Sequence, residues 1–436
     1  MNRKLVKFDE FIDCKTKKFT HKGANLISST VHSRRSFLRV FGRGLTAMSL
    51  LSGCDMLSEN GKLESRPSNY SHNLASPPPS YSSLSTNALK SSNLDVKIGQ
   101  MLIVGFRGLE VDNMHFIIRD IQEHHLGGVL LSDYDFITRR TVRNIESPSQ
   151  LKSLIASLKS VSAIPILICI DHEGGIVTRL KELYNFPPTV SHKYLGELND
   201  LEITRKEAAL MAKTLADLGI NLNLAPVVDL CVNTSNPIIA KLERCFSADP
   251  QVVTDHALQF IKAHHEEGVL CALKHFPGHG SSATDSHRGL SDVSDTWSRI
   301  ELEPFARIIK DKQADAIMTA HLFNFNLDEQ FPATLSHKII TGVLRGELNY
   351  EGVVISDDLQ MGAIINNYSF ETAIQKTIEA GVDILIFSNN SVYSEKIVAN
   401  AIKVIKKLIQ SGTISESRVD DSYQRIQQLK KRLQTR

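Results

Sequence analysis

Eight short apolar runs, separated by longer polar-rich stretches, constrain the fold of this chain more than any other feature. Each run is four to eight residues long, and all of them lie between residues 101 and 387. Apolar runs of this length predict strands buried on both faces, as in parallel sheets. The runs are Met101–Phe106, Gly128–Leu131, Pro165–Asp171, Leu222–Asp229, Leu270–His275, Ala316–His321, Gly352–Asp357 and Asp383–Phe387.

The segments between the runs carry apolar residues at helical spacing, as in Arg205–Gly219, Thr254–Glu267 and Ser336–Leu348. Eight strands alternating with helices over about 340 residues favour an α/β fold, a single (β/α)8 barrel of the TIM type, over an open doubly wound sheet. We expect one barrel domain over residues 94–436, with the chain after Ser415 as a closing helix. The sequence has no glycine-rich phosphate loop and no dinucleotide-binding fingerprint.

The N-terminal 54 residues have a different composition. They hold eleven Lys and Arg against three acids, a net charge of +8, and leave 39 basic and 45 acidic residues downstream. Three features follow one another along this segment: Arg34-Arg35, the short apolar run Gly44–Gly53, and Leu51-Ser52-Gly53-Cys54. In this order they resemble a twin-arginine signal that ends in a lipobox. Residues 1–54 are therefore predicted to be a signal peptide with lipidation at Cys54. The alternative is a basic tail on a cytoplasmic protein.

Residues 55–93 are rich in Ser, Asn and Pro and lack apolar periodicity. This composition predicts a disordered tether. We therefore expect an exported protein, held at a bacterial membrane by its lipid anchor. The mildly acidic remainder of the chain gives no basic surface for nucleic acid.

Several predicted strands end in polar side chains. The carboxyl ends of barrel strands carry the active sites of such folds, and here they carry Asp171, Asp229, Lys274-His275, His321 and Asp357. Taken singly, an acid at a strand end is often a helix N-cap, and a lone histidine is often a packed, hydrogen-bonded residue. Together these residues predict a cleft for a hydrophilic ligand with many hydroxyl groups.

The six cysteines have no pair at the short spacing of a zinc or redox site. Cys169 and Cys271 lie in predicted strands, so we expect buried thiols. Cys231 and Cys245 lie closer together in a loop and could form a disulfide if the protein is exported. No metal site or organic cofactor is predicted.

The sequence resembles the family 3 glycoside hydrolases, particularly the bacterial β-N-acetylglucosaminidases, from about Leu94 to Val404. The most specific motif is Lys274-His275-Phe276-Pro277-Gly278-His279-Gly280 followed by Asp285-Ser286-His287. Asn223-Leu224-Ala225-Pro226-Val227-Val228-Asp229 and Ser356-Asp357-Asp358-Leu359 add to it.

The resemblance implies catalytic roles for three residues. Asp357 matches the nucleophile of a retaining glycosidase, and its neighbour Asp358 more plausibly orients the loop. His287 matches a histidine that replaces the usual second carboxylate as general acid and base, since its unperturbed pKa is near 6.5. Asp285, two residues earlier, would fix the tautomer of His287 and stabilise its charged form. Gly278 and Gly280 fit a loop that moves.

The resemblance also implies that Asp171, Arg244, Lys274 and His275 hold the sugar in the first subsite. Arg179 and His321 are weaker candidates for the same cleft, and Asp229 is predicted to support other residues. The chain departs from the family at three places. Ile176 replaces a common Arg, Cys245 and Ser247 replace Ser and Gly, and Gly362 replaces a common Lys.

These residues predict a retaining β-N-acetylhexosaminidase that removes terminal β-linked N-acetylglucosamine from peptidoglycan-derived or related glycans. The alternatives are a family 3 β-glucosidase, a phosphorylase that uses the same covalent intermediate, and an inactive saccharide-binding lipoprotein. A β-glucosidase of this family typically has a second α/β domain, for which residues 94–436 leave no room. A pure binding protein needs neither Asp357 nor the Asp285–His287 pair.

Overall fold

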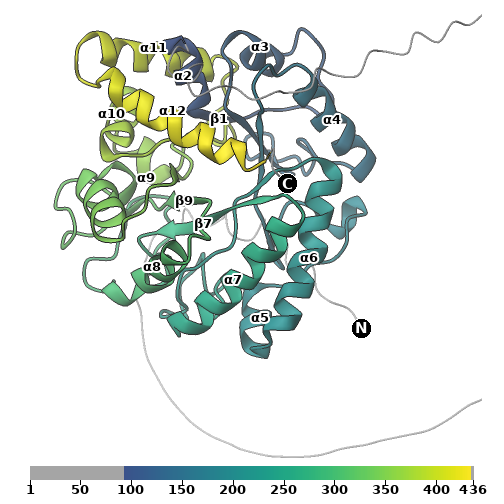
Figure 1. Ribbon diagram of the computed structural model, residues 1–436, viewed down its shortest axis with the longest axis vertical. Helices are drawn as coiled ribbons and strands as arrows, with labels where there is room; N and C mark the ends of the chain where they lie inside the picture. The colour runs from purple at the N-terminus through teal and green to yellow at the C-terminus, as the bar shows by residue number, and fades with distance from the viewer. Residues whose placement is uncertain (1–92, 434–436) are drawn as a thin grey trace, which may run out of the picture. The chain divides into compact units, whose positions relative to one another are not determined.

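A computed structural model describes residues 93–433 of the chain, which form a parallel β-barrel surrounded by helices (Figure 1). The eight main strands pair in the order β11-β9-β7-β6-β3-β2-β1-β12, and every neighbouring pair is parallel. Their bounds are β1 (Leu102–Gly105), β2 (Gly128–Leu131), β3 (Leu167–Ile170), β6 (Leu222–Asn223), β7 (Leu270–Phe276), β9 (Ala316–Thr319), β11 (Val353–Ile355) and β12 (Leu385–Phe387). The predicted (β/α)8 barrel is confirmed. Seven of the eight strands fall within their predicted runs, and β7 extends one residue beyond its run, to Phe276. The predicted signal peptide and tether lie outside the described residues.

Four shorter strands form two small sheets outside the barrel. β4 (His172–Gly174) and β5 (Val177–Thr178) pair antiparallel, and β8 (Ser291–Asp292) pairs with β10 (Leu322–Phe323) in parallel. The α-helices are α2 (Leu94–Gln100), α3 (Phe116–Glu123), α4 (Pro148–Ser160), α5 (His192–Leu198), α6 (Leu201–Leu218), α7 (Pro250–Glu266), α8 (Glu303–Lys310), α9 (Gly362–Ile365), α10 (Phe370–Ala380), α11 (Ile397–Gln410) and α12 (Glu416–Lys431). The 3₁₀ segments are η2 (Glu182–Tyr184), η3 (Arg299–Leu302) and η4 (Ala333–Leu335), and η5 (Lys338–Glu347) is a π-helix.

The predicted helices form, with differences at their ends. α6 begins at Leu201, four residues before its predicted start, because the Asp200 carboxylate caps it by accepting from the backbone N–H groups of Glu202 and Ile203. Gly219, at φ 90°, ends it in the left-handed conformation that glycine adopts without strain. The segment predicted at Ser336–Leu348 forms the π-helix η5, whose wider turns apolar spacing alone does not distinguish from an α-helix.

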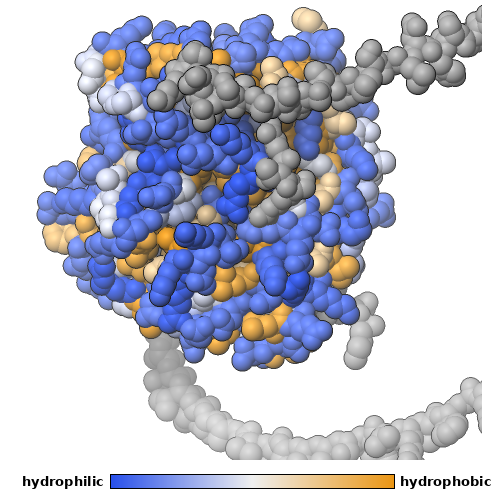
Figure 2. All heavy atoms as spheres, viewed as in Figure 1, coloured by the Kyte–Doolittle hydropathy of each residue, from blue (hydrophilic) through white to orange (hydrophobic). Residues whose placement is uncertain are grey.

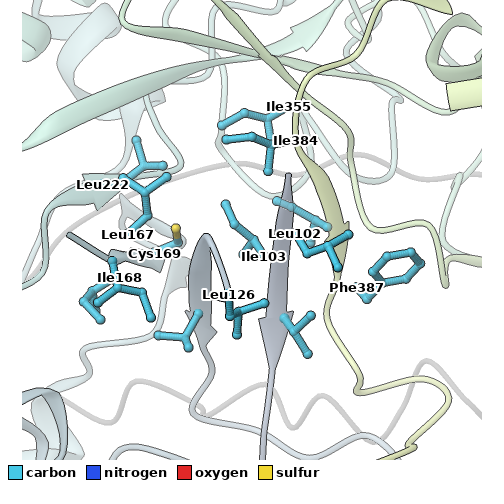
Figure 3. Packing of buried hydrophobic residues seen from close by; sticks show 14 of the residues in the cluster. Leu102, Ile103, Leu126, Leu167, Ile168, Cys169, Leu222, Ile355, Ile384 and Phe387 are labelled. Atoms are coloured by element: carbon cyan, nitrogen blue, oxygen red, sulfur yellow. The ribbon is translucent and has the colours of Figure 1, made fainter. Parts of the chain in front are cut away.

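The hydrophobic core fills the barrel and the layer between strands and helices. Four fully buried side chains from three different strands are Leu102 and Ile103 of β1, Leu167 of β3 and Leu222 of β6 (Figure 3). Burial of one such side chain stabilises the fold by about 1.5–3 kcal/mol. The viewed face of the outer surface is mostly hydrophilic, with hydrophobic residues in small scattered groups (Figure 2). The first and last described α-helices, α2 and α12, pack against each other and so join the two ends of the domain.

The barrel closes at a seam between β11 and β12. One bridge, Ile355 with Ile384, joins them, and these two side chains lie next to each other in Figure 3. Asp383 completes the seam: its backbone N–H donates to the Val354 carbonyl at 2.8 Å, and its carboxylate accepts from the Val354 N–H at 3.0 Å.

None of the helices within residues 93–433 is long and apolar enough to span a bilayer.

Candidate active site

A buried network of charged side chains lies where β3, β4 and β7 end. The Lys274 ammonium, 2% exposed, lies 2.7 Å from a carboxylate oxygen of Asp171 and 2.7 Å from one of Glu173. The two acids face the same lysine because residues two apart in an extended segment point to the same side. Burial opposes the charge on Lys274, but the carboxylates of Asp171 and Glu173 raise its pKa above the ordinary value. Lys274 is therefore a cation held next to the barrel axis.

Glu173 joins this network to the loop after β6. Arg244 donates to both carboxylate oxygens of Glu173, from Nε and Nη2, each at 2.7 Å. Burial opposes the charge of Glu173, but Arg244 and Lys274 hold the pKa of Glu173 well below its usual range. Glu173 was not among the residues predicted from the sequence. Its position two residues after Asp171 in the same extended segment is the signal that could have found it.

His275 lies between Arg244 and Asp229. Its Nδ1 donates to the Asp229 carboxylate at 2.7 Å, and its Nε2 accepts from Arg244 at 3.1 Å. Asp229 is fully buried and also accepts from the backbone N–H of His279 at 2.8 Å. This geometry agrees with the prediction that Asp229 supports other residues.

Asp357 and Asp358 face different surroundings. Burial opposes the charge of Asp357, but the nearby His321, His275 and His287 hold the pKa of Asp357 below its usual range. Asp358 points toward β12, where it accepts from the backbone N–H of Ser388 at 2.9 Å, and burial raises its pKa. Asp357 is the acid that faces the histidines, and Asp358 ties two loops together.

His321 is fully buried behind the loop that carries Asp357. Its Nε2 donates to the carbonyl oxygen of Asp358 at 2.9 Å, and its Nδ1 bonds the Thr334 hydroxyl at 2.8 Å. Burial lowers the pKa of His321, while the carboxylate of Asp357 opposes this effect. In this position His321 orients the Asp357–Asp358 segment.

Asp285 and His287 lie on the long loop after β7. The carboxylate of Asp285 accepts from His287 at both the ring Nδ1, at 2.8 Å, and the backbone N–H, at 2.9 Å. Surrounding protein atoms displace part of the water around the ring and oppose the charge on His287, but its bond to Asp285 and the charge of Asp357 raise the pKa of His287 above 6.5. The His287 side chain is 58% exposed, so its free Nε2 is open to a ligand and to water.

The remaining candidate, Arg179, directly follows β5 and lies beside Asp171. Its guanidinium lies 3.4 Å from the Asp171 carboxylate and 3.8 Å from the carboxylate of Asp133. Asp133 is 1% exposed, follows β2 and also pairs with Lys181. Asp133 was not predicted from the sequence, although it too is an acid close to the end of a strand, two residues after β2.

The loop after β6 is closed by a disulfide between Cys231 and Cys245, with a Cα–Cα distance of 5.6 Å. The sequence left this pairing open, and the structure forms it. Cys169 and Cys271 are buried, as predicted. Arg244 directly precedes Cys245 and so lies within the segment that the disulfide closes.

Within residues 93–433, Asp171, Arg244, Lys274, His275, Asp285, His287 and Asp357 therefore gather around the carboxyl ends of the barrel strands. A barrel mouth that combines a carboxylate, an Asp–His pair and several buried donors carries the groups that the glycoside-hydrolysing class of enzymes requires.

Comparison with known proteins supports this class. Residues 93–429 match the family described as glycosyl hydrolase family 3 N terminal domain. The chain belongs to this family.

Two curated relatives carry the name β-hexosaminidase. β-Hexosaminidase A of Pseudoalteromonas piscicida is 34% identical over 337 residues, which cover 72% of this chain and 54% of that protein. The β-hexosaminidase of Tolumonas auensis is 35% identical over 295 residues, 66% of this chain and 83% of the relative. The chain thus spans about half the length of the first relative and most of the second.

A solved family 3 β-N-acetylglucosaminidase from Paenibacillus sp. FPU-7 superposes with a TM-score of 0.72 at 34% identity. The match covers 79% of this chain and 63% of that one. A β-N-acetylhexosaminidase from Beutenbergia cavernae matches with a TM-score of 0.67 at 27% identity, over 77% of this chain and 97% of the other.

Proposed function

We propose that this protein is a retaining β-N-acetylhexosaminidase that hydrolyses terminal β-linked N-acetylglucosamine. One arrangement at the barrel mouth carries the proposal. Asp357, whose low pKa keeps it ionised, interacts electrostatically with His287, and His287 is paired with Asp285. The names of the relatives add the sugar: both curated proteins are β-hexosaminidases, and the Paenibacillus structure is a β-N-acetylglucosaminidase.

In the first step Asp357 attacks the anomeric carbon while His287 protonates the departing oxygen. A carboxylate with a depressed pKa is ionised at neutral pH, as a nucleophile requires. A raised pKa increases the fraction of His287 that carries a proton near neutral pH, and the protonated ring can donate to the leaving group. In the second step the neutral His287 takes a proton from a water molecule whose oxygen attacks the anomeric carbon. The bond from that carbon to Asp357 breaks, and the carboxylate is regenerated.

Asp171, Lys274, Arg244 and His275 are assigned to the sugar. Lys and Arg donate to hydroxyl oxygens, and a carboxylate accepts hydroxyl protons. Of these four side chains, Asp171 is the most exposed, at 23%. It can therefore contact a ligand without a large movement. Arg179, next to Asp171, is a further candidate for the same subsite.

The catalytic assignment is tested with a 2-fluoro glycosyl donor and two variants. The donor should label Asp357, and Asp357→Ala should lose turnover. His287→Ala should lose about 10²–10⁴-fold on disaccharides but much less on aryl glycosides whose leaving groups need no proton. The exposed His337 provides a control, since His337→Ala should match the wild type. A label on Asp358, or equal losses on both substrate types, would contradict the assignment.

We further propose that peptidoglycan-derived fragments are the substrates. Mass spectrometry of the products from purified fragments tests this. Release of free N-acetylglucosamine supports it, whereas a sugar 1-phosphate formed only with added phosphate would indicate the phosphorylase.

We also propose that the protein is exported and anchored through Cys54. The Cys231–Cys245 disulfide supports export, because such bonds persist in oxidising compartments. The test is fractionation of cells that express the wild type, Arg34→Lys/Arg35→Lys or Cys54→Ser. The wild type should be in the membrane fraction, the first variant should remain in the cytoplasm, and the second should carry no lipid. Cytoplasmic protein in all three would overturn the proposal.

A further inference from the structure

The segment Cys231–Cys245, called here the Arg244 loop, is a separate structural unit at the edge of the site. Its disulfide joins residues 14 apart, and Ile238 and Ile239 pack with Cys245 in a small apolar cluster of their own. Apart from the disulfide, the two ends of the loop are joined by a backbone bond from the Cys231 N–H to the Ser247 carbonyl at 2.8 Å.

The Arg244 loop holds the guanidinium of Arg244 from within. Nη1 of Arg244 donates to the carbonyl oxygen of Ile238 at 3.0 Å, and the Arg244 backbone N–H donates to the Ile239 carbonyl at 3.0 Å. Glu173 and His275 hold the same guanidinium from the barrel side. Arg244 is 9% exposed, so only a small part of its side chain can reach a ligand. Both sets of contacts are therefore needed to hold the guanidinium in the single orientation that presents this part to the ligand.

The same loop contacts the root of the segment that carries His287. The side-chain amide of Asn236 donates to the carbonyl oxygens of His279 and Gly280, at 2.8 and 3.1 Å. A Cβ on Gly280 would lie 1.8 Å from the carbonyl oxygen of Leu230, so only glycine permits this approach. Gly280 thus has a packing role here, in addition to any part in loop motion.

We propose that the Cys231–Cys245 disulfide positions Arg244 for substrate binding, so that its loss weakens the binding of N-acetylglucosaminides more than it slows their turnover. This inference rests on the proposed function. A cross-link removes alternative conformations of the closed loop. Without it, Arg244 occupies its binding geometry for a smaller fraction of the time, and apparent affinity falls in proportion to that fraction.

The test compares the wild type with Cys231→Ser/Cys245→Ser on an aryl N-acetylglucosaminide. We expect KM to rise about tenfold and kcat to change less than threefold. A tenfold change in KM is within the range of coupling measured between neighbouring residues of one network. The assays are run well below the melting temperature of the variant. A lower melting temperature with an unchanged KM would mean a purely stabilising cross-link and would overturn the inference.

A double-mutant cycle with Arg244→Lys tests whether the effect passes through Arg244. In the Arg244→Lys background, loss of the disulfide should raise KM less than twofold further. A further tenfold rise there would refute positioning of Arg244.

Reduction of the unmutated protein is a second route if the double serine variant does not fold. The wild type should show the same rise in KM after reduction, and reoxidation should reverse it. Mass spectrometry of the wild type should find the Cys231–Cys245 peptide pair, and free thiols at both positions would overturn the inference. Hydrolysis by the wild type is measured first, so a failure of the proposed function is seen separately.

Discussion

Gly362 lies three residues after Leu359, the last residue of the nucleophile motif, and its lack of a side chain has a local reason. Its backbone N–H donates to the carbonyl oxygen of His287 at 3.1 Å, and the N–H of Ala363 donates to that of Ser286 at 3.3 Å. A Cβ on Gly362 would lie 2.7 Å from the His287 carbonyl oxygen and 2.9 Å from the Arg288 carbonyl carbon. The loop that carries the proposed acid is therefore docked on the start of α9.

Gly362→Ala should push this loop away from the nucleophile. Because His287 then protonates the leaving oxygen less effectively, we expect kcat on disaccharides to fall about 10–100-fold, within the usual contribution of a general acid. Substrates with good leaving groups should lose less than threefold. Leaving-group dependence of kcat, measured over a series of aryl glycosides, checks this.

Gly289, on the same loop, is the matched control. A Cβ there meets nothing within 4 Å, so Gly289→Ala should behave as the wild type. If both substitutions have the same effect, or Gly362→Ala leaves the leaving-group dependence unchanged, the docking has no part in catalysis.

At this scale the sequence predicted the residues that end strands but not all of their partners. Asp171, Lys274 and Asp357 were found from strand ends and motifs, and the structure brings them to one barrel mouth. Glu173 and Asp133 were missed because each is one more acid in a polar segment. What distinguishes them in the structure is the approach of a cation from a segment distant in the sequence, Arg244 to Glu173 and Lys181 to Asp133.

Among the elements, the seam between β11 and β12 contains a buried carboxylate with several cationic partners. Asp383, fully buried, pairs with Arg345 at 2.7 Å, Arg425 at 3.2 Å and Arg418 at 3.5 Å. Its bond to the Val354 N–H adds to the backbone bonds that join the two segments. Removal of one member of a buried ion pair is destabilising, because its charged partners then stay buried without a counter-charge.

Asp383→Asn should lower the free energy of unfolding by about 3 kcal/mol, at the lower end of the range for breaking a buried pair, since the arginines keep some access to water. Denaturant titration measures this. Asp420→Asn is the control, because Asp420 is 42% exposed and pairs with Lys97 at the surface, where such pairs contribute at most about 1 kcal/mol. Similar losses for both variants would argue against a special role for the seam.

Sequence patterns predicted the elements well but not where they stop pairing. The run Leu222–Asp229 was predicted as one strand, yet β6 pairs only at Leu222–Asn223. Pro226 lacks a donor for the ladder, and the chain beyond β6 returns to β7 only at the isolated bridge of Val227 with Lys274. Apolar character marks burial, whereas pairing depends on the neighbouring strand.

For the whole molecule, the alternation of strands and helices predicted the barrel because that order leaves few ways to bury eight apolar strands. The same pattern could not predict the disulfide, which depends on how the loop after β6 returns to its start. It also gave no sign that charged groups are buried away from the active site, as Asp120 in α3 and Lys430 in α12 are.

These two groups should give the stability of the protein opposite slopes on either side of neutral pH. Burial raises the pKa of Asp120 from 3.8 to about 7, so the folded chain binds the extra proton and stability falls as pH rises between these values. Burial lowers the pKa of Lys430 from 10.5 to about 7, so the unfolded chain binds the extra proton and stability rises with pH above 7.

Substitution of each residue should remove its own slope. Each proton contributes at most about 1.4 kcal/mol per pH unit, so two units give roughly 2 kcal/mol. Relative to the wild type, Asp120→Asn should lose the fall in unfolding free energy between pH 5 and pH 7. Lys430→Met should lose the rise between pH 7 and pH 9, although the bonds from its Nζ to Gln100 and to the Gly127 carbonyl disappear at every pH. Denaturant titrations of the three proteins at pH 5, 7 and 9 measure both slopes, and parallel curves would mean that neither group changes its protonation on unfolding.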